Sequence, residues 1–418
     1  MPRLTKLVPL LLLVALGLPA SYGSAQDIPE GNARAVTAFA EGLEAYNAQR
    51  YADALPHLYR AYELDNTFVV ALFHAALCES NLASDVPPDS LVKIVLESRD
   101  RLSPYYQHRA ESFLAKLSGD RELGLEHLRK AAEVGPGTKA WYNLALDLNQ
   151  MNRPQEARAA LQHLEPDQGP MAGWFGYYSV LAVSNHYLGR FEEELSVARE
   201  AGEAYPERRT PLILQTRALA ALGRMEGLDQ LFVEAAANPA TGAGNTVGAL
   251  MIVAAAELKA HGNMDAGSHM YERAVEWYGG AGDAVAAPVQ QTWHTLALFG
   301  AGSFREAIEN CDRHLADQPD YLWYHGMAWL AAIRAGDEER AAVEQAYYEG
   351  LAPDRSPRFL PLNMAYGQAA RGNAEEAVAL LEEAVGLGTA FAMWWHRDPA
   401  FDLIRDHPAF QEFLRPKG

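Results

Sequence analysis

A short polar turn recurs along most of this 418-residue chain, and this internal repetition constrains the fold more than any other feature. Each turn has Gly or Asn followed by a polar residue, and successive turns are 33 to 40 residues apart. A period of this length is typical of solenoids, in which stacked units share one continuous core. We therefore expect one elongated array instead of the two or three compact domains that the length alone suggests. The turns lie at Gly119, Asn152, Gly189, Gly223, Gly262, Gly302, Gly336 and Gly372.

The helices of the repeats carry small residues at a fixed spacing. A small residue is followed four positions later by a larger apolar residue and, three positions further on, by a second small residue. This spacing places all three on one helical face, where the small side chains let the two helices of a hairpin approach closely. The pattern predicts a chain of helical hairpins. Its four full copies are Ala54, Leu58 and Ala61; Gly124, Leu128 and Ala131; Gly267, Tyr271 and Ala274; and Ala377, Leu381 and Ala384.

Two stretches resemble the tetratricopeptide repeat family. Residues Trp141–Ala145 followed by Arg153–Ala157 resemble a good copy, and so do Tyr51–Ala54 leading to Ala61–Asp65. The resemblance implies an all-α, tetratricopeptide-type solenoid, a right-handed superhelix of helical hairpins, with about ten repeats in residues 26–391. We interpret residues 236–245, which are rich in Gly and Ala, as a loose connector, and the sequence leaves open whether it is a hinge between two sub-arrays. The repeats are expected to start near Ala35, Val69, Tyr105, Thr138, Phe175, Arg209, Gly248, Pro288, Leu322 and Arg358.

A narrower resemblance covers nearly all of residues 26–418. Leu102–Pro104, Gly119–Arg121, Glu192–Leu195 and the tail from His396 to Gly418 resemble the repeat region attached to some bacterial serine/threonine kinases and cyclase- or TolB-type regulators. The catalytic and sensor domains of those proteins have no counterpart in this sequence. The tripeptide His396–Asp398 matches a kinase catalytic loop, but the sequence lacks the Gly-rich loop, the strand lysine and the D-F-G motif that a kinase needs.

The last residues, 392–418, are expected to form capping helices, because a solenoid exposes an apolar face at its last repeat unless a polar-faced element covers it. Pro408 disfavours a continuous helix through His407, so two short helices are expected. We predict that their apolar residues pack around Leu380, Leu381 and Ala384. These residues are Phe401, Ile404, Phe410, Phe413 and Leu414.

The first 25 residues have the three-part layout of a secretory signal peptide. Arg3 and Lys6 precede the apolar stretch Leu7–Ala20, and Gly23–Ala25 supplies small residues for cleavage after Ala25. We therefore expect a periplasmic or secreted protein that does not insert into a membrane after cleavage. Because no Cys lies near the cleavage site, a lipid anchor is not expected. An uncleaved membrane anchor remains the alternative.

Charge and cysteine content exclude further classes of partner and site. The net charge of −19 repels phosphate backbones, so nucleic acid is not expected as a partner. The two cysteines, Cys78 and Cys311, are separated by several repeats, too far apart in a linear array for a disulfide. Two cysteines are also too few for a Cys-based structural zinc site. We expect both to be small buried side chains.

No motif for catalysis, a metal or a cofactor stands out in the sequence. None of the 13 histidines has the H-E-x-x-H spacing, and His261 and His269 are eight positions apart. There is no G-x-S-x-G elbow, and the Gly-rich stretches 242–244 and 279–282 follow no strand pattern, so we interpret them as loops. We therefore expect no catalytic residues, no metal and no cofactor. An exported hydrolase whose site the sequence does not reveal remains the alternative.

The expected function is an exported protein–protein interaction scaffold. The first helices of such repeats line a concave groove that takes an extended peptide or a helix. Asn143 and Arg109 match part of the family's clamp for a peptide carboxylate, but the next repeat lacks the basic residues of that clamp. A regulatory subunit of an envelope complex is a narrower form of this hypothesis. The residues predicted to face the groove are Tyr142, Asn149, His186, Trp323 and Tyr366.

Overall fold

A computed structural model describes residues 32–82, 86–237, 246–280, 288–352 and 355–418. These residues form α-helices, short 3-10 turns and loops, and none of them lies in a strand, which confirms the predicted all-α fold class. Among them, no helix is long and apolar enough to cross a bilayer. The expected signal peptide and residues 238–245 of the expected connector lie outside the described residues.

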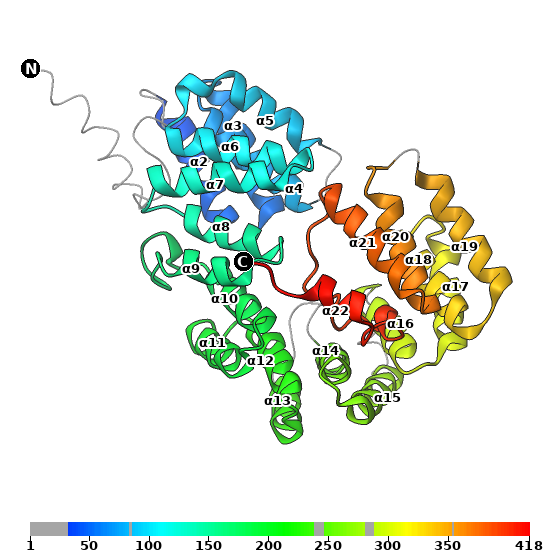
Figure 1. Cartoon of the computed structure of the whole chain (residues 1–418). Helices are drawn as coiled ribbons and strands as arrows, with labels where there is room; N and C mark the ends of the chain where they lie inside the picture. Colours follow the sequence, from blue (N-terminus) through cyan, green and yellow to red (C-terminus); the bar gives the residue numbers. More distant parts are fainter. Residues whose placement is uncertain (1–31, 83–85, 238–245, 281–287, 353–354) are drawn as a thin grey trace, which may run out of the picture. The chain divides into compact units, whose positions relative to one another are not determined.

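Residues 1–180 and 181–418 form two compact units, each of which is described by itself. Helix α10 (Gly176–Tyr187) runs across the boundary between them (Figure 1). The other helices of the first unit are α2 (Ala33–Asn47), α3 (Tyr51–Leu64), α4 (Val69–Leu82), α5 (Pro88–Glu97), α6 (Pro104–Leu117), α7 (Arg121–Val134), α8 (Ala140–Asn149) and α9 (Pro154–Leu161). The second unit contains α11 (Phe191–Ala204), α12 (Thr210–Ala221), α13 (Met225–Ala237), α14 (Val247–Ala260), α15 (Met264–Gly280), α16 (Pro288–Gly300), α17 (Phe304–Asp317), α18 (Leu322–Ala335), α19 (Glu338–Leu351), α20 (Phe359–Arg371), α21 (Ala374–Gly386) and α22 (Pro408–Leu414).

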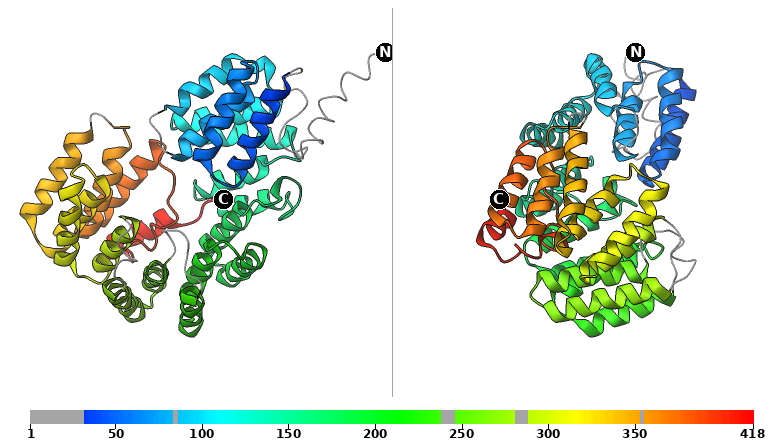
Figure 2. Two further views of the ribbon diagram at one scale, coloured as in Figure 1. Left: turned by 180° about the vertical axis from the view of Figure 1, so that it is seen from behind. Right: turned by 90° about the vertical axis from the view of Figure 1, so that its right-hand side faces the viewer.

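Consecutive helices from α2 to α21 pair as hairpins, which Figure 2 shows from two further sides. Three expected repeat starts, Val69, Pro288 and Leu322, are the first residues of α4, α16 and α18. All eight predicted turn residues lie between the two helices of a hairpin and have a positive φ, such as 73° at Gly336 and 57° at Asn152. Gly reaches this left-handed region at no steric cost, and Asn tolerates it better than most residues. The prediction of a tetratricopeptide-like helical repeat is therefore confirmed.

The small residues predicted at hairpin contacts are buried between helices. All members of the four full copies of the pattern lie in the interior. At Gly267 a Cβ atom would lie 2.8 Å from the carbonyl oxygen of Ala255, on the facing helix. This spacing shows that α14 and α15 approach each other backbone to backbone.

In the second unit the first helices of successive hairpins also contact one another. The contacts run from α12 to α14, α16, α18 and α20 in turn. Helix α14 is therefore covered on all sides, with an unbroken buried run from Gly248 to Leu258, whereas α15 buries a single face. Cys311, on α17, is buried and free, as is Cys78 in the first unit.

The C-terminal residues form a 3-10 turn (Pro399–Phe401) followed by α22, so only one of the two expected capping helices is an α-helix. The turn is closed locally, because the Asp398 side chain accepts from the Ala400 N–H and Arg405 donates to the Asp398 carbonyl. These hydrogen bonds replace those of a regular helix. The apolar side chains of this region join the buried cluster of the last repeat, which contains Leu381, Phe401, Ile404 and Phe410, with Leu380, Phe413 and Leu414 at its edge.

Candidate functional site

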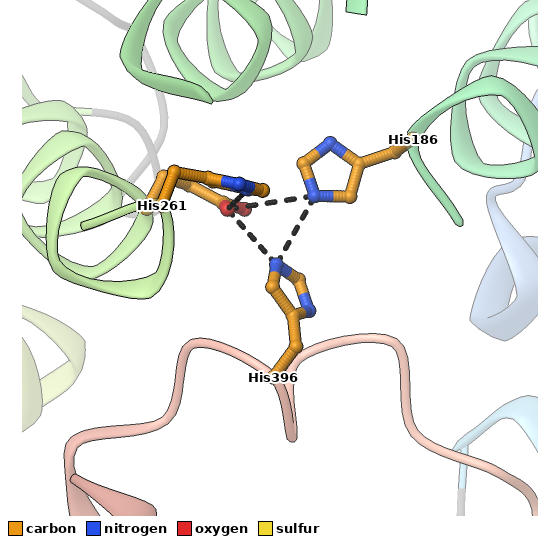
Figure 3. Close-up of side chains that lie close together, drawn as sticks. His186, His261 and His396 are labelled. Carbon is orange, nitrogen blue, oxygen red and sulfur yellow. Dashed lines mark hydrogen bonds and ion pairs between the residues drawn. The ribbon is translucent and has the colours of Figure 1, made fainter. Parts of the chain in front are cut away.

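Four titratable side chains of the second unit converge at one point. His186 comes from the last turn of α10, Glu257 and His261 from the end of α14, and His396 from the loop that follows α21. Figure 3 shows the three imidazole rings pointing toward one another from these separate segments. One nitrogen of each histidine and one oxygen of Glu257 all lie within 4.8 Å of one another. We call these four residues the histidine cluster.

The Oε2 atom of Glu257 lies at the centre of the contacts. It is 2.9 Å from Nε2 of His396, 3.4 Å from Nε2 of His186 and 3.5 Å from Nε2 of His261. The Nε2 atoms of His186 and His396 are 3.1 Å apart. Glu257 is completely buried and His186 is nearly so, while His261 and His396 are partly exposed.

Local structure explains how two of these residues share one face. Glu257 and His261 are four positions apart on α14, which places their side chains one above the other. His261 is the C-cap of α14, and its N–H donates to the carbonyl of Glu257. The Nδ1 atom of His396 lies 2.6 Å from the carbonyl oxygen of Met393, and this contact fixes the ring of His396.

A second layer of charged groups surrounds the histidine cluster. Nδ1 of His186 lies 2.7 Å from the buried carboxylate of Glu194, which also accepts from Nε of Arg217 at 2.5 Å. On the other side, Arg397 lies 3.3 Å from Oε1 of Glu257. The negative charges of the two carboxylates therefore cancel the positive charges of the two guanidinium groups. The net charge of the site then depends on how many of the three histidines are protonated.

These contacts shift the pKa values of the buried groups. Burial lowers the pKa of His186, but the Glu257 and Glu194 carboxylates outweigh burial and raise it above its usual value. Burial raises the pKa of Glu257, but His186, His396 and Arg397 hold it well below the usual range. Burial lowers the pKa of His396 to about 4, despite the attraction of Glu257. The cluster therefore keeps Glu257 ionised and His396 neutral.

The tautomers of two histidines follow from their partners. A carboxylate and a backbone carbonyl only accept hydrogen bonds, so Nδ1 of His186 and Nδ1 of His396 must both carry a proton. Nε2 of His396 lies 3.1 Å from Nε2 of His186 and 2.9 Å from Oε2 of Glu257, so these three acceptor atoms need a proton or a cation among them. Chemically, this arrangement can hold either a shared proton or a metal ion.

The histidine cluster also fixes a segment of the chain against the first helices. Residues 391–402, which we call the C-terminal segment, contact α10, α12, α14 and α20. Nη1 of Arg217 lies 3.6 Å from the sulfur of Met393, and Lys259 pairs with Asp402. Phe391 packs edge-on against Tyr187, with ring centres 5.9 Å apart.

The five residues predicted to face a groove are placed differently from one another. Tyr142 is buried against the edge of Trp174, and Asn149 is buried and donates to the Val180 carbonyl at 3.1 Å. His186 belongs to the histidine cluster, and Trp323 is partly buried on α18.

Tyr366 is also partly buried, and its hydroxyl accepts from Nε1 of Trp395 at 3.2 Å. The structure thus brings His186 and Tyr366 to the same element, because both contact the C-terminal segment. Sequence reasoning missed Glu257, His261 and His396 as members of a site. The role of the five predicted residues in partner binding stays a prediction.

A smaller group of the same residue types lies in the first unit. Oε2 of Glu111 lies 3.1 Å from Nδ1 of His108 and 3.0 Å from Nδ1 of His127. Arg99 pairs with the other oxygen of Glu111 at 3.1 Å, and all three members of the group are partly exposed. This group offers three ligand atoms, one fewer than the histidine cluster.

Comparisons with known proteins give fold-level similarity at most. No protein-family model and no curated protein matches the chain. Among solved structures, the TPR domain of P58(IPK) is 15% identical with a TM-score of 0.26, covering 91% of this chain and 96% of that one. Naa15/Naa10 bound to HypK-THB is 15% identical with a TM-score of 0.27, covering 90% of this chain and 60% of that one.

The human IFIT1 dimer with PPP-AAAA is 14% identical with a TM-score of 0.31, covering 93% of this chain and 82% of that one. At these scores, nothing about partner or ligand is carried over to this chain.

Proposed function

We propose that this chain is an exported protein–protein interaction scaffold that holds peptide segments against the first helices of its hairpins. One observation carries the proposal. The second unit already holds a peptide segment in this way, because its own C-terminal segment lies on α10, α12, α14 and α20. A surface that accepts one segment of its own chain has the properties needed to accept a segment of a partner.

The contacts to the C-terminal segment are of several chemical kinds. Tyr366 accepts from an indole N–H and also packs against Phe401, with ring centres 4.8 Å apart. Lys259 pairs with the carboxylate of Asp402. Aromatic anchors combined with a few charge-paired contacts are typical of peptide recognition. A partner segment with aromatic and acidic residues fits this surface best.

Capture of partners tests the scaffold hypothesis. The full chain, tagged at its C-terminus, is expressed in an envelope-containing host, cross-linked and recovered, and its partners are identified by mass spectrometry. Trp323→Ala removes a partly buried aromatic from first helix α18, while Val233→Ala changes an exposed side chain on second helix α13 as a matched control. We expect a partner that Val233→Ala retains and Trp323→Ala loses. Equal recovery by both variants would contradict the use of the first helices.

Export is the second part of the proposal and has its own test. N-terminal sequencing of the protein recovered from the envelope or medium is expected to begin at Gln26. A chain that still begins at Met1 would support a retained anchor. Assignment to a regulatory subunit of an envelope complex is a narrower hypothesis, and co-purification of the chain with a membrane complex would support it.

A further inference from the structure

We propose that His186, Glu257, His261 and His396 form a binding site for a divalent transition metal of the zinc class, which fastens the C-terminal segment to α10 and α14. This departs from the sequence-based expectation of no metal site. The proposal does not depend on a partner protein, so its failure and the failure of the scaffold hypothesis are separate outcomes.

The spacing of the four ligand atoms fits tetrahedral coordination. Nitrogen and oxygen ligands lie about 2.0–2.1 Å from zinc, so neighbouring ligand atoms of a tetrahedron are about 3.3 Å apart. Four of the six separations among these atoms are 2.9, 3.1, 3.4 and 3.5 Å, close to that value, and all six are within 4.8 Å. The ligand atoms therefore need only small shifts to receive an ion.

The outer contacts orient the histidines as they do in metal sites. Metal-bound histidines usually donate their second ring N–H to a carboxylate or a backbone carbonyl. His186 contacts the Glu194 carboxylate in this way, and His396 contacts the Met393 carbonyl. Both contacts turn Nε2 toward the centre of the cluster, where the two Nε2 atoms lie 3.1 Å apart and can either share a proton or bind one cation.

Two buried atoms of the cluster lack hydrogen bonds. Nε2 of His261 and Oε1 of Glu257 have no hydrogen-bond partner, although buried polar atoms normally have one. Arg397 approaches Oε1 of Glu257 and leaves Oε2 directed at the three imidazoles. A metal ion at the centre would give Nε2 of His261 a partner, while Oε1 of Glu257 keeps its ion pair with Arg397.

The ligand types select the class of metal. Three imidazoles and one carboxylate suit zinc, copper, nickel or iron, whereas calcium and magnesium need six or more oxygen ligands. Structural zinc sites are closed by four protein ligands, while catalytic sites keep one position open for water. Because four side chains converge here and Glu257 is completely buried, the geometry favours a closed, structural site.

The ligands come from three separate parts of the second unit. Their separation along the chain means that binding an ion would close a large loop between α10 and the C-terminal segment. The ion would add to the direct contacts that hold the segment on the first helices, such as the Lys259–Asp402 pair and the Trp395–Tyr366 hydrogen bond.

Cobalt titration of the full chain tests the site. The protein is stripped with a chelator, and Co²⁺ is used because its visible absorption reports tetrahedral coordination. We expect a tetrahedral site that fills at one ion per chain and from which Zn²⁺ displaces Co²⁺. In His261→Gln and in His396→Gln, affinity is expected to fall by at least about tenfold. His269→Gln, which changes an exposed histidine of α15, is the matched control and should bind like the wild type.

Folding and stability measurements on the variants distinguish loss of metal binding from loss of structure. Nε2 of His261 makes no hydrogen bond, so His261→Gln should fold like the wild type, and circular dichroism of the metal-free proteins checks this. Zn²⁺ should raise the unfolding midpoint of the wild type and of His269→Gln, but not of His261→Gln. His127→Gln reports on the smaller group in the first unit.

Three results would overturn the proposal. They are the absence of tetrahedral Co²⁺ absorption, wild-type affinity in both His261→Gln and His396→Gln, and loss of binding in His127→Gln alone. The first two results would mean that the histidine cluster is not a metal site, and the third would place the metal at the smaller group in the first unit.

Discussion

Because α14 and α15 approach each other closely, Gly267→Ala is expected to lower stability, although the same change in an open helix usually raises it. Gly267 lies in the first turns of α15, and replacing Gly by Ala inside a helix ordinarily stabilises a protein by about 0.5–1 kcal/mol. At Gly267, however, the added Cβ atom would lie 2.8 Å from the Ala255 carbonyl oxygen and 3.1 Å from the Lys259 nitrogen. Both are backbone atoms, so no side-chain rotation relieves the contact.

The expected magnitude follows from these opposing effects. Overpacking a tight contact costs about 1–3 kcal/mol, which exceeds the gain in helix propensity. We therefore expect Gly267→Ala to destabilise the second unit by about 0.5–2 kcal/mol. For a domain of this size, each kcal/mol lowers the melting temperature by about 2–4 °C. The melting temperature should therefore fall by a few degrees.

A second Gly→Ala variant, without a steric contact, separates the steric effect from the gain in helix propensity. Gly202 lies in α11, and its added Cβ would be 3.6 Å from the nearest atoms, which is an ordinary contact. Gly202→Ala should therefore stabilise the protein by a few tenths of a kcal/mol to about 1 kcal/mol. Urea unfolding followed by circular dichroism measures both variants. If Gly267→Ala unfolds at the same or a higher urea concentration than the wild type, the inferred backbone contact is wrong.

Three further perturbations test other parts of the fold. Ala157→Trp should destabilise the first unit by about 1–3 kcal/mol or more, because Ala157 is completely buried, and an unchanged melting curve would refute its placement. Deleting residues 398–418 should expose the cluster around Leu381 and promote aggregation. Light scattering measures the oligomeric state and calorimetry the melting temperature. A monomer with an unchanged melting temperature would show that these residues are not a cap. Burial and the nearby charge of Arg109 lower the pKa of Lys139 from 10.5 to about 7. Between pH 7 and 10.5 the unfolded chain therefore binds more protons than the folded chain, so the stability of the wild type rises with pH in that window. Lys139→Met should therefore be more stable than the wild type at pH 7, with the advantage shrinking toward pH 9 in urea titrations, and a constant difference would argue against the lowered pKa.

Features encoded by short stretches of sequence could be predicted. The turn residues were found because a left-handed backbone between two helices favours Gly or Asn, and each of the eight has a positive φ. The hairpin contacts were found because small residues recur at helical spacing. The C-terminal region was harder, since the hydrogen bonds of Asp398 and Arg405 close a 3-10 turn where helical spacing predicted an α-helix.

The histidine cluster could not be predicted, because its members come from three segments far apart in the sequence. Only Glu257 and His261 are local to each other, four positions apart on one helix, and this pair was the one available signal. This pair does not match the H-E-x-x-H motif, because one of its two ligands is a carboxylate. His186 was selected as a first-helix residue, but no sequence pattern shows that it meets His396.

The buried charged residues around the histidine cluster indicate that the cluster does more than stabilise the fold. Glu194, Glu257 and Arg217 are almost completely buried on α11, α14 and α12, where apolar side chains could pack. Removing such ions from water costs several kcal/mol each, and replacing a buried ion pair by apolar residues is often neutral or stabilising. A helical repeat whose interior served only packing would therefore gain little from these groups. Glu194 contacts the imidazole of His186, and Arg397 contacts the carboxylate of Glu257. These contacts instead orient the ligand atoms of the cluster toward a common centre. That arrangement is what a bound ion or a controlled attachment of the C-terminal segment requires, and it accounts for charges that packing alone does not.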